Sequence, residues 1–423
     1  MRFIHAHRTQ KAMHIPGRKL AFSLFLLLLT SCGGESGPTQ EAATRPTTVQ
    51  ISSRHFGMHI HDPAAHGWPV VPIGFWRLWD SGVQWPHLEP SPGEWNFDRL
   101  DQQIAMAETQ GADPVIVLGL TPAWASARPR ETCNYAPGNC AEPANISDWQ
   151  NYVFQVATRY KGRVHYYELW NEPSLKSYYT GSVESLLQLS QVAYNTLKEI
   201  DPTVTVLSPA PVVQKTGIAW LKEYLALGGG NYADVIAYHF YQFPGSPEDL
   251  VTYFAGVKDV LNSHGVNKPI WDTEMGWGPG QEFSSEQHMA AFVARTFLLH
   301  WAAGITHVAW YAWDNQDWSS LRFTRSDKAT PTRAGIAFAQ MQQWAATLNA
   351  VRCTVDFADT WVCQLTQFDG TTRYAVWNPH ESFSFSIPSS WRVTTVERVG
   401  GETSPINNNG TIEIGISPVL LVP

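Results

Sequence analysis

The chain has 423 residues, of which 44% are hydrophobic, and its formal net charge is −8. A chain of this length and composition has room for one large domain with an extensive core and a small companion domain. The acidic balance and the lack of a long basic run argue against nucleic acid as a partner. Aromatic residues make up 13% of the chain and include 19 tryptophans, which suits a cleft for sugar rings as well as a core.

Residues 1–31 are typical of an export signal. Basic residues precede an apolar stretch, Leu20–Leu29, which is too short to span a bilayer. The Leu-Thr-Ser-Cys sequence that ends at Cys32 resembles the lipobox of bacterial lipoproteins, in which the cysteine is lipidated and becomes the first mature residue. We therefore expect a lipid anchor on a bacterial membrane, facing the periplasm or the cell surface. The resemblance favours the outer membrane because Gly33, rather than Asp, follows; a secretory signal with a chance cysteine is the alternative.

Residues 32–49 are rich in Gly, Ser, Thr, Pro and Glu, and we interpret them as a flexible tether. Beyond the tether, four cysteines form two close pairs along the sequence. Because an exported protein reaches an oxidising compartment, these short loops predict local disulfides. A zinc site would require tighter spacing and nearby histidines, so we expect no metal there. The predicted disulfides are Cys133–Cys140 and Cys353–Cys363.

Strand-like runs alternate with helix-like runs in the region 50–348. The helical segments have apolar faces and end at glycines such as Gly111, Gly162 and Gly304, and residues 284–287 form a capping-box pattern. Eight strands that alternate with helices predict a parallel (β/α)8 barrel, of the TIM type. The predicted strands are His55–His61, Phe75–Trp79, Asp113–Leu118, Val164–Trp170, Val204–Leu207, Val235–Tyr241, Pro269–Thr273 and His307–Trp313.

The region 349–423 has a different pattern. Short alternating runs such as Trp361–Leu365 and Arg373–Trp377 are separated by turn residues, among them Asp369-Gly370 and Asn409-Gly410. These runs predict a small antiparallel β domain. It carries no pair of candidate catalytic groups, so we expect it to stabilise the barrel by packing against it; sugar binding is the alternative.

Two predicted strands end in a glutamate. Asn171 and Glu172 follow the fourth strand, where Pro173 stops its continuation, and Glu274 ends the seventh. Parallel barrels place their active site at the carboxyl ends of the strands, and two carboxylates there are the minimum for splitting a glycosidic bond. A lone glutamate at such a position would more simply pair with a barrel arginine. We interpret the neighbouring Glu168 in that way, as a buried partner for a basic group.

These motifs resemble a clan of retaining glycoside hydrolases built on the same barrel, clan A. The resemblance rests on Asn-Glu-Pro ending at Pro173, on Glu274, on His-x-Tyr at Tyr241 and on Trp-x-x-Leu-Glu-Pro at 85–90. The Tyr-Glu-Leu-Trp-Asn-Glu-Pro motif and the small β domain most resemble family 39 and its bacterial exopolysaccharide-cleaving relatives. This resemblance covers about residues 51–423. This resemblance implies an O-glycosyl hydrolase that cleaves a β-linked polysaccharide or oligosaccharide by double displacement, without a cofactor or metal.

The resemblance also implies roles for single residues. Glu172 would be the general acid and base, and Glu274 the nucleophile that forms a glycosyl-enzyme. Asn171 would contact the sugar 2-hydroxyl, and Arg77 and Tyr241 would orient Glu274 and hold it ionised. The other expected substrate contacts are His239, Trp313 as the platform under the sugar, and Trp79, Trp124 and Trp277 at flanking subsites.

Two other functions stay open at this point. The His-x-His pattern at His59 and His61 also begins metal-dependent amidohydrolase barrels, and His239 and Asp314 are available as further ligands. The fifth predicted strand, however, ends without a ligand. The second possibility is a surface carbohydrate-binding lipoprotein without catalysis, although both carboxylates are present.

Overall fold

The structure is a computed structural model. The expected signal segment 1–31, Cys32 and most of the expected tether lie outside the residues that it describes. No helix within the described ranges is long and apolar enough to cross a membrane. The described residues are 46–241, 244–278, 282–315, 317–407 and 409–423.

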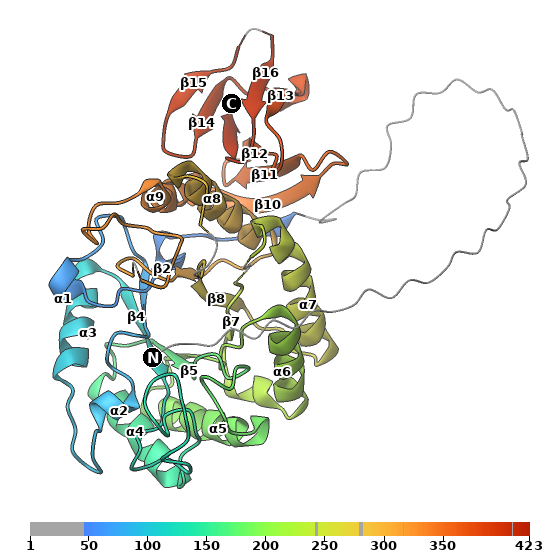
Figure 1. Ribbon diagram of the computed structural model, residues 1–423. Helices are drawn as coiled ribbons and strands as arrows, with labels where there is room; N and C mark the ends of the chain where they lie inside the picture. The colour runs from blue at the N-terminus through green and yellow to red at the C-terminus, as the bar shows by residue number, and fades with distance from the viewer. Residues whose placement is uncertain (1–45, 242–243, 279–281, 316, 408) are drawn as a thin grey trace, which may run out of the picture. The chain divides into compact units, whose positions relative to one another are not determined.

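Eight parallel strands form the barrel in the order β6-β5-β4-β3-β2-β9-β8-β7 (Figure 1). Parallel bridges from Leu207 to Val235 and from Val212 to His239 join its two ends. The strands are short and largely apolar because helices cover the sheet. Each of the eight predicted strands overlaps one of these, so the predicted barrel is confirmed. The strands are β2 (Phe56–Met58), β3 (Phe75–Leu78), β4 (Asp113–Leu118), β5 (Tyr166–Leu169), β6 (Thr205–Leu207), β7 (Ile236–Tyr238), β8 (Ile270–Met275) and β9 (Val308–Trp310).

Helices surround the barrel (Figure 1). Of the three expected stop glycines, Gly162 and Gly304 lie just beyond the helix ends, which are at Arg159 and Ala302. One helix ends at Gly111, which adopts a left-handed conformation with φ of 69°. Another starts after Ser285, whose side chain accepts a hydrogen bond from the backbone N–H of His288. The α-helices are α1 (Pro63–His66), α2 (Trp85–Leu88), α3 (Asp98–Gln110), α4 (Ile146–Arg159), α5 (Val183–Ile200), α6 (Gln214–Ala226), α7 (Leu250–Ser263), α8 (Glu286–Ala302) and α9 (Arg333–Ala345). The 3-10 helices are η1 (Ser53–His55), η2 (Gly229–Tyr232), η3 (Pro247–Asp249) and η4 (Ser389–Trp391).

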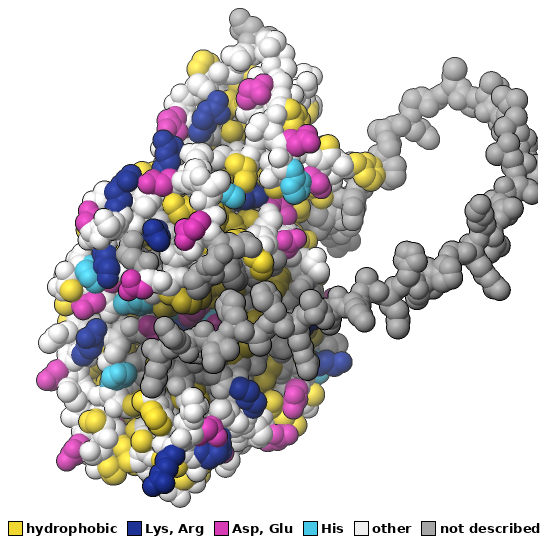
Figure 2. Space-filling view, in the orientation of Figure 1, with side chains coloured by type: hydrophobic (Ala, Val, Ile, Leu, Met, Phe, Trp, Pro, Cys, Tyr) yellow, Lys and Arg dark blue, Asp and Glu magenta, His cyan; other side chains and the backbone are white. Residues whose placement is uncertain are grey.

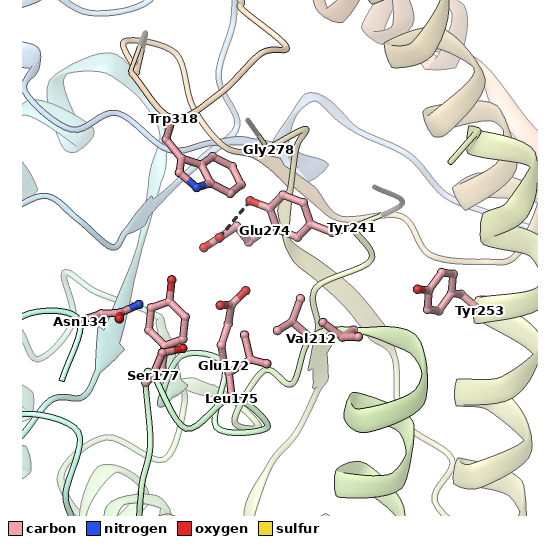
Figure 3. Close-up of a pocket in the computed structure, with 12 residues that line it drawn as sticks. Asn134, Glu172, Leu175, Ser177, Val212, Tyr241, Tyr253, Glu274, Gly278 and Trp318 are labelled. Carbon is pink, nitrogen blue, oxygen red and sulfur yellow. Dashed lines mark hydrogen bonds between the residues drawn. The ribbon is translucent and has the colours of Figure 1, made fainter. Parts of the chain in front are cut away.

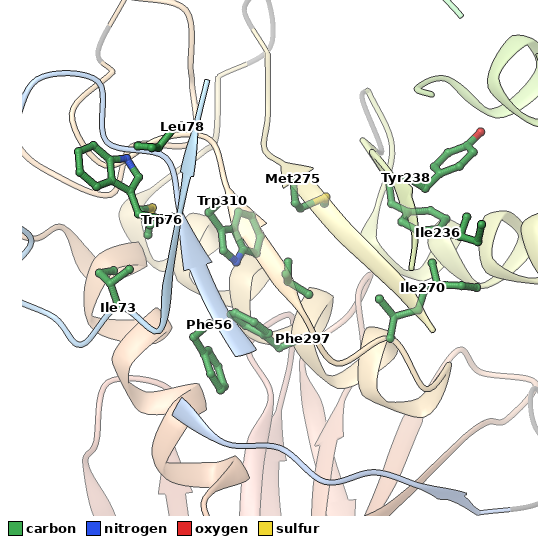
Figure 4. Packing of buried hydrophobic residues seen from close by; sticks show 14 of the residues in the cluster. Phe56, Ile73, Trp76, Leu78, Ile236, Tyr238, Ile270, Met275, Phe297 and Trp310 are labelled. Atoms are coloured by element: carbon green, nitrogen blue, oxygen red, sulfur yellow. The ribbon is translucent and has the colours of Figure 1, made fainter. Parts of the chain in front are cut away.

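Aromatic side chains fill the layer between strands and helices. Phe297 of α8 lies between Phe56 of β2 and Trp310 of β9, with ring centroids 4.9 and 5.9 Å apart (Figure 4). All three side chains are buried. Truncating a buried Phe or Trp to Ala typically costs about 3–5 kcal/mol. This packing holds β9 beside β2 and so fixes where the chain leaves the end of β9.

The β domain is antiparallel, as predicted. Its main sheet has the strand order β1-β10-β11-β12-β17-β14-β15, and β13 pairs with β16. Thr47 and Thr48, which we assigned to the tether, instead form β1 and pair with β10. The first strand after the barrel starts at Leu348, one residue before the predicted boundary. The strands are β1 (Thr47–Thr48), β10 (Leu348–Val355), β11 (Trp361–Gln367), β12 (Thr372–Trp377), β13 (Phe383–Ser386), β14 (Thr395–Arg398), β15 (Thr403–Pro405), β16 (Thr411–Ile414) and β17 (Val419–Val422).

Polar contacts join the β domain to the barrel helices. The indole of Trp377 donates to Glu248 at 2.7 Å, and the indole of Trp344 in α9 donates to Glu397 at 3.1 Å. These bonds fit the expectation that the domain packs against the barrel. Basic and acidic side chains are interspersed over the visible face (Figure 2).

Both predicted disulfides are present. Cys133–Cys140 closes a loop between β4 and α4, and Cys353–Cys363 joins directly paired residues of β10 and β11. The first of them lies beside the site described below.

Candidate active site

The two predicted carboxylates lie at the same end of the barrel. Glu172 follows β5 and has a φ of 45°, and Trp170 before it has a φ of 72°. Such left-handed conformations cost of order 1–3 kcal/mol each for residues other than glycine. Backbone hydrogen bonds hold them, from Glu172 to Ala210 and from Trp170 to Leu118. The bend after β5 directs Glu172 towards Glu274 of β8, and Figure 3 shows the two carboxylates facing each other.

Two cavities with shared walls open between these carboxylates and the surrounding loops. The larger has a volume of about 360 Å³ and includes Glu172, and the smaller has a volume of about 240 Å³ and includes Asn171. Glu274 lines both, so the cavities meet at this carboxylate. The other shared lining residues are Asn134, Tyr178 and Trp318.

The separation of the carboxylates is short. One carboxylate oxygen of Glu172 and one of Glu274 lie within 4.8 Å of each other. Retaining glycosidases place their carboxyl groups about 5–5.5 Å apart, whereas inverting enzymes need about 6.5–9.5 Å to fit a water molecule. The spacing therefore fits a retaining enzyme, in which one carboxylate attacks the sugar directly.

Arg77 and Tyr241 bind Glu274, one to each oxygen. Arg77 donates from Nη1 to Oε2 at 2.7 Å, and the Tyr241 hydroxyl donates to Oε1 at 3.0 Å. Arg77 is fully buried and also donates from Nε to Glu168 at 3.1 Å. Glu168 is therefore the structural partner of a basic group, as the sequence predicted.

The two glutamates have different protonation behaviour. Burial raises the pKa of Glu274 to about 7, and the positive charge of Arg77 opposes that rise. Burial, followed by the charge of Glu274, raises the pKa of Glu172 well above its usual range. No cation bonds to Glu172 within the described part of the chain. Glu172 consequently keeps its proton at a pH where Glu274 is ionised.

The chain matches the family described as glycosyl hydrolases family 39 over residues 64–323. It belongs to glycosyl hydrolases family 39. Family membership makes this barrel a retaining O-glycosyl hydrolase and implies a polysaccharide or oligosaccharide as substrate.

Solved structures with the same fold include a family 39 glycoside hydrolase from the gut symbiont Bacteroides cellulosilyticus WH2. It has a TM-score of 0.69 and 21% identity, over 88% of this chain and 82% of that chain. A family 39 β-xylosidase from Caulobacter crescentus has a TM-score of 0.60 and 16% identity, over 89% and 98% of the two chains. The catalytic domain of family 30 xylanase C from Talaromyces cellulolyticus has a TM-score of 0.58 and 14% identity, over 91% and 98%.

Asn171 lies in this family 39 site as expected. Its Oδ1 accepts a hydrogen bond from Arg77 at 2.8 Å, which fixes the orientation of the amide. Its Nδ2 is buried and has no partner within the described structure. A buried donor without a partner is costly, and a substrate oxygen would satisfy it.

His239 does not contact the cavities, contrary to our expectation of a substrate contact. Its Nδ1 lies 2.9 Å from Oε1 of Glu172, and its side chain is buried. Burial lowers the pKa of His239 well below its usual range, so the ring is neutral. The neutral ring shares this hydrogen bond with the carboxyl group of Glu172 and so orients it.

Trp313 was expected to be the platform under the sugar, and this expectation is wrong. It is 1% exposed, lines neither cavity and packs in the core. The physical reason is that β9 ends at Trp310, three residues before the predicted end. Tyr311 and Trp318 line the smaller cavity instead, with ring centroids 5.4 Å apart.

The three tryptophans expected at flanking subsites have different positions. Trp79 lines the smaller cavity, beside Asn171 and Glu274. Trp124 lines neither cavity and donates its indole N–H to the backbone of Glu89 at 2.9 Å. Trp277 lines a separate cavity near Arg295.

The sequence did not single out Asp80, Asn134, Tyr135 or Tyr178, all of which line the smaller cavity. Asn134 and Tyr135 belong to the loop closed by Cys133–Cys140. The predicted disulfide could have indicated that Asn134 and Tyr135 lie in a fixed loop. The position of Asp80 just after a predicted strand could have indicated that it lies at the mouth of the barrel.

The ligand set of an amidohydrolase is not assembled. Asp314 accepts backbone hydrogen bonds from His61 and Asp62, each at 2.8 Å, and so holds a loop. His59 lies against the backbone oxygen of Thr273. Within the described ranges, the three side chains close enough to share a metal are Glu172, His239 and Glu274.

Proposed function

We propose that this family 39 enzyme cleaves β-linked polysaccharide or oligosaccharide by double displacement, with Glu172 as the general acid and base and Glu274 as the nucleophile. The observation that carries the proposal is that one carboxylate oxygen of Glu172 and one of Glu274 lie within 4.8 Å of each other. This spacing supports attack by a carboxylate rather than by a water molecule.

The environment of Glu274 supports its role as nucleophile. Arg77 and Tyr241 occupy one position on each oxygen and hold the carboxylate in one orientation. Both donors favour the ionised form. Each oxygen keeps a further lone pair that can attack the anomeric carbon. A sugar can reach Glu274 because this residue lines both cavities.

The environment of Glu172 supports its role as acid. It lines the larger cavity, its pKa is raised by burial and by Glu274, and its hydrogen-bond partner is the uncharged ring of His239. When the charge of Glu274 is neutralised in a glycosyl-enzyme, the pKa of Glu172 falls. The same group can then act as a base.

The reaction has two balanced steps. Glu274 attacks the anomeric carbon, the bond to the leaving oxygen breaks, and Glu172 gives its proton to that oxygen. A water molecule then gives a proton to Glu172 while its oxygen attacks the anomeric carbon and releases Glu274. The unpartnered Nδ2 of Asn171 donates to the oxygen of the sugar 2-hydroxyl during both steps.

Aromatic side chains provide stacking surfaces around the site. Trp79 and Tyr311 line the smaller cavity, Tyr253 lines the larger, and Trp318 lines both. The Caulobacter crescentus relative is named a β-xylosidase and the Talaromyces cellulolyticus relative a xylanase. We therefore place xylan and β-xylosides among the first substrates to try.

The proposal is tested with a panel of plant and bacterial polysaccharides and of 4-nitrophenyl β-glycosides. The matched variants are Glu172→Gln, Glu274→Gln and, as a control, Glu223→Gln, which makes the same change at an exposed position of α6. We expect turnover by the wild type and the control. Glu274→Gln should lose all turnover, and Glu172→Gln should keep more on substrates with good leaving groups. Tight oligosaccharide binding without turnover by the wild type would instead indicate a binding protein.

A further inference from the structure

The smaller cavity contains a carboxylate that the proposed reaction does not use. Asp80 lies two residues beyond β3 and has a φ of 55°, a conformation that Asp tolerates better than most residues. It lines this cavity together with Asn171 and Glu274. The smaller cavity lacks Glu172, which lines the larger one, so the leaving group belongs in the larger cavity and the glycone in the smaller.

Two tyrosines orient Asp80. The Tyr135 hydroxyl donates to Oδ1 at 3.0 Å, and the Tyr311 hydroxyl donates to Oδ2 at 2.9 Å. An ionised carboxylate accepts about four hydrogen bonds, so one position on each oxygen remains for a ligand. Among the described residues, no Lys or Arg forms an ion pair with Asp80. The negative charge of Asp80 is therefore not compensated by a salt bridge, and a ligand in the smaller cavity experiences it.

The cation at this end of the barrel does not compensate Asp80. Arg77 is bound to Glu168, Glu274 and Asn171. The pKa of Glu274, which burial raises despite the opposing charge of Arg77, is raised further by Asp80. Asp80 and ionised Glu274 therefore present two negative charges to a sugar in the smaller cavity.

We propose that Asp80 is a specificity-determining residue that accepts hydrogen bonds from hydroxyl groups of the glycone and makes the site select an uncharged sugar over a uronic acid. This inference rests on the proposed function, because it takes Glu274 as the nucleophile. Hydroxyl donors suit a fixed carboxylate acceptor. A uronate carboxylate adds a third negative charge, which the other two repel.

The test compares kcat/KM at pH 7 for pairs of 4-nitrophenyl β-glycosides that share the configuration of the ring hydroxyls and differ at C5, where one member carries a carboxylate and the other an uncharged group. The pairs are glucoside with glucuronide, galactoside with galacturonide, and xyloside with glucuronide, and the pair used is the one that contains the neutral glycoside cleaved fastest in the panel. We expect the wild type to prefer the neutral member by about 100-fold or more, as close like charges imply. Asp80→Asn keeps the side-chain size and suits the same φ. It should narrow this preference at least about tenfold.

Tyr135→Phe is the matched control, because it removes one donor to Asp80 but keeps the charge. Its absolute activity changes, whereas the ratio of neutral to uronide turnover should stay within about threefold of the wild-type ratio. A wild-type enzyme that prefers the uronide would overturn the inference. So would an Asp80→Asn variant that folds, by its thermal unfolding, with the wild-type ratio. Failure of the proposed function has a different signature, which is full turnover by Glu274→Gln.

Discussion

Arg77 and Glu274 form a buried ion pair, with Nη1 of the arginine 2.7 Å from Oε2 of the glutamate. The same guanidinium pairs with Glu168, so that one cation compensates two carboxylates at the centre of the barrel mouth. The pair joins β3 to β8 and links the orientation of the nucleophile to the stability of the barrel.

Replacing Arg77 by Met should destabilise the protein and abolish turnover. Breaking a buried pair from one side typically costs about 3–5 kcal/mol, because the remaining charges are left without a partner. Urea unfolding measures the loss. Arg54→Met is the control: Arg54 pairs with Asp113 at 2.9 Å but is 56% exposed. Such surface pairs contribute about 0–1 kcal/mol. Equal stability of the two variants would contradict the role of Arg77.

Removing the Tyr241 hydroxyl should move the acidic limb of the pH profile. Burial raises the pKa of Glu274 to about 7, and the Tyr241 hydrogen bond is among the contacts that lower it. In Tyr241→Phe this pKa rises further, so more Glu274 is protonated at a given pH. The acidic limb of kcat/KM therefore shifts to higher pH. Tyr253→Phe changes another cavity tyrosine, whose hydroxyl accepts a hydrogen bond from the backbone N–H of Gln214 at 3.2 Å, and should leave that limb in place. A Tyr241→Phe limb at the wild-type position, or at lower pH, would count against the assignment.

The two disulfides should have separable roles. Each closes a short loop, for which chain entropy accounts for about 2–3 kcal/mol of stability. Cys353→Ser/Cys363→Ser should lower stability by that amount and leave KM unchanged. Cys133→Ser/Cys140→Ser should lower stability and also raise KM, because Asn134 and Tyr135 of its loop line the smaller cavity. Unfolding curves and steady-state kinetics separate the two effects. A KM effect of equal size in both variants would contradict this division.

We also propose that Cys32 is lipidated and anchors the protein, as its position after the apolar segment indicates. Cys32→Ala should release the protein from the membrane fraction or block its maturation. Intact-mass analysis of the wild type should show a chain that starts at Cys32 and carries acyl groups. Cleavage at another site, without acyl mass, would end this proposal.

Much of the fold followed from the sequence because buried parallel strands are short apolar runs between helices with clear stop signals. Four of the site residues also followed, because Arg77, Asn171, Glu172 and Glu274 lie in or directly after such runs. The rule that strand ends meet at one face of the barrel located the two glutamates. The roles of Arg77 and Asn171 rested on the family resemblance.

The positions of the remaining side chains could not be predicted, because they depend on where each strand ends. Alternation along a longer strand would place His239 and Tyr241 on one face, but β7 ends at Tyr238. Both side chains still reach the pair of glutamates, His239 at Glu172 and Tyr241 at Glu274, but only Tyr241 lines a cavity. Trp313 lies in the core because β9 also ends earlier than predicted.

Asp80 and Tyr135 were missed for a different reason. They are 55 residues apart in the chain and meet only because the loop that contains Tyr135 folds over the end of β3. Loop paths of this kind depend on tertiary packing, which a pattern of hydrophobic residues does not describe.

The most direct test of the account is to trap the nucleophile. A 2-deoxy-2-fluoro β-glycoside with a good leaving group, of the sugar that the panel identifies, slows breakdown of the glycosyl-enzyme. Mass spectrometry of the digested protein should find the sugar attached to Glu274, and no attachment in Glu274→Gln. Attachment to another residue, or a first-formed product of inverted configuration, would contradict the proposed mechanism.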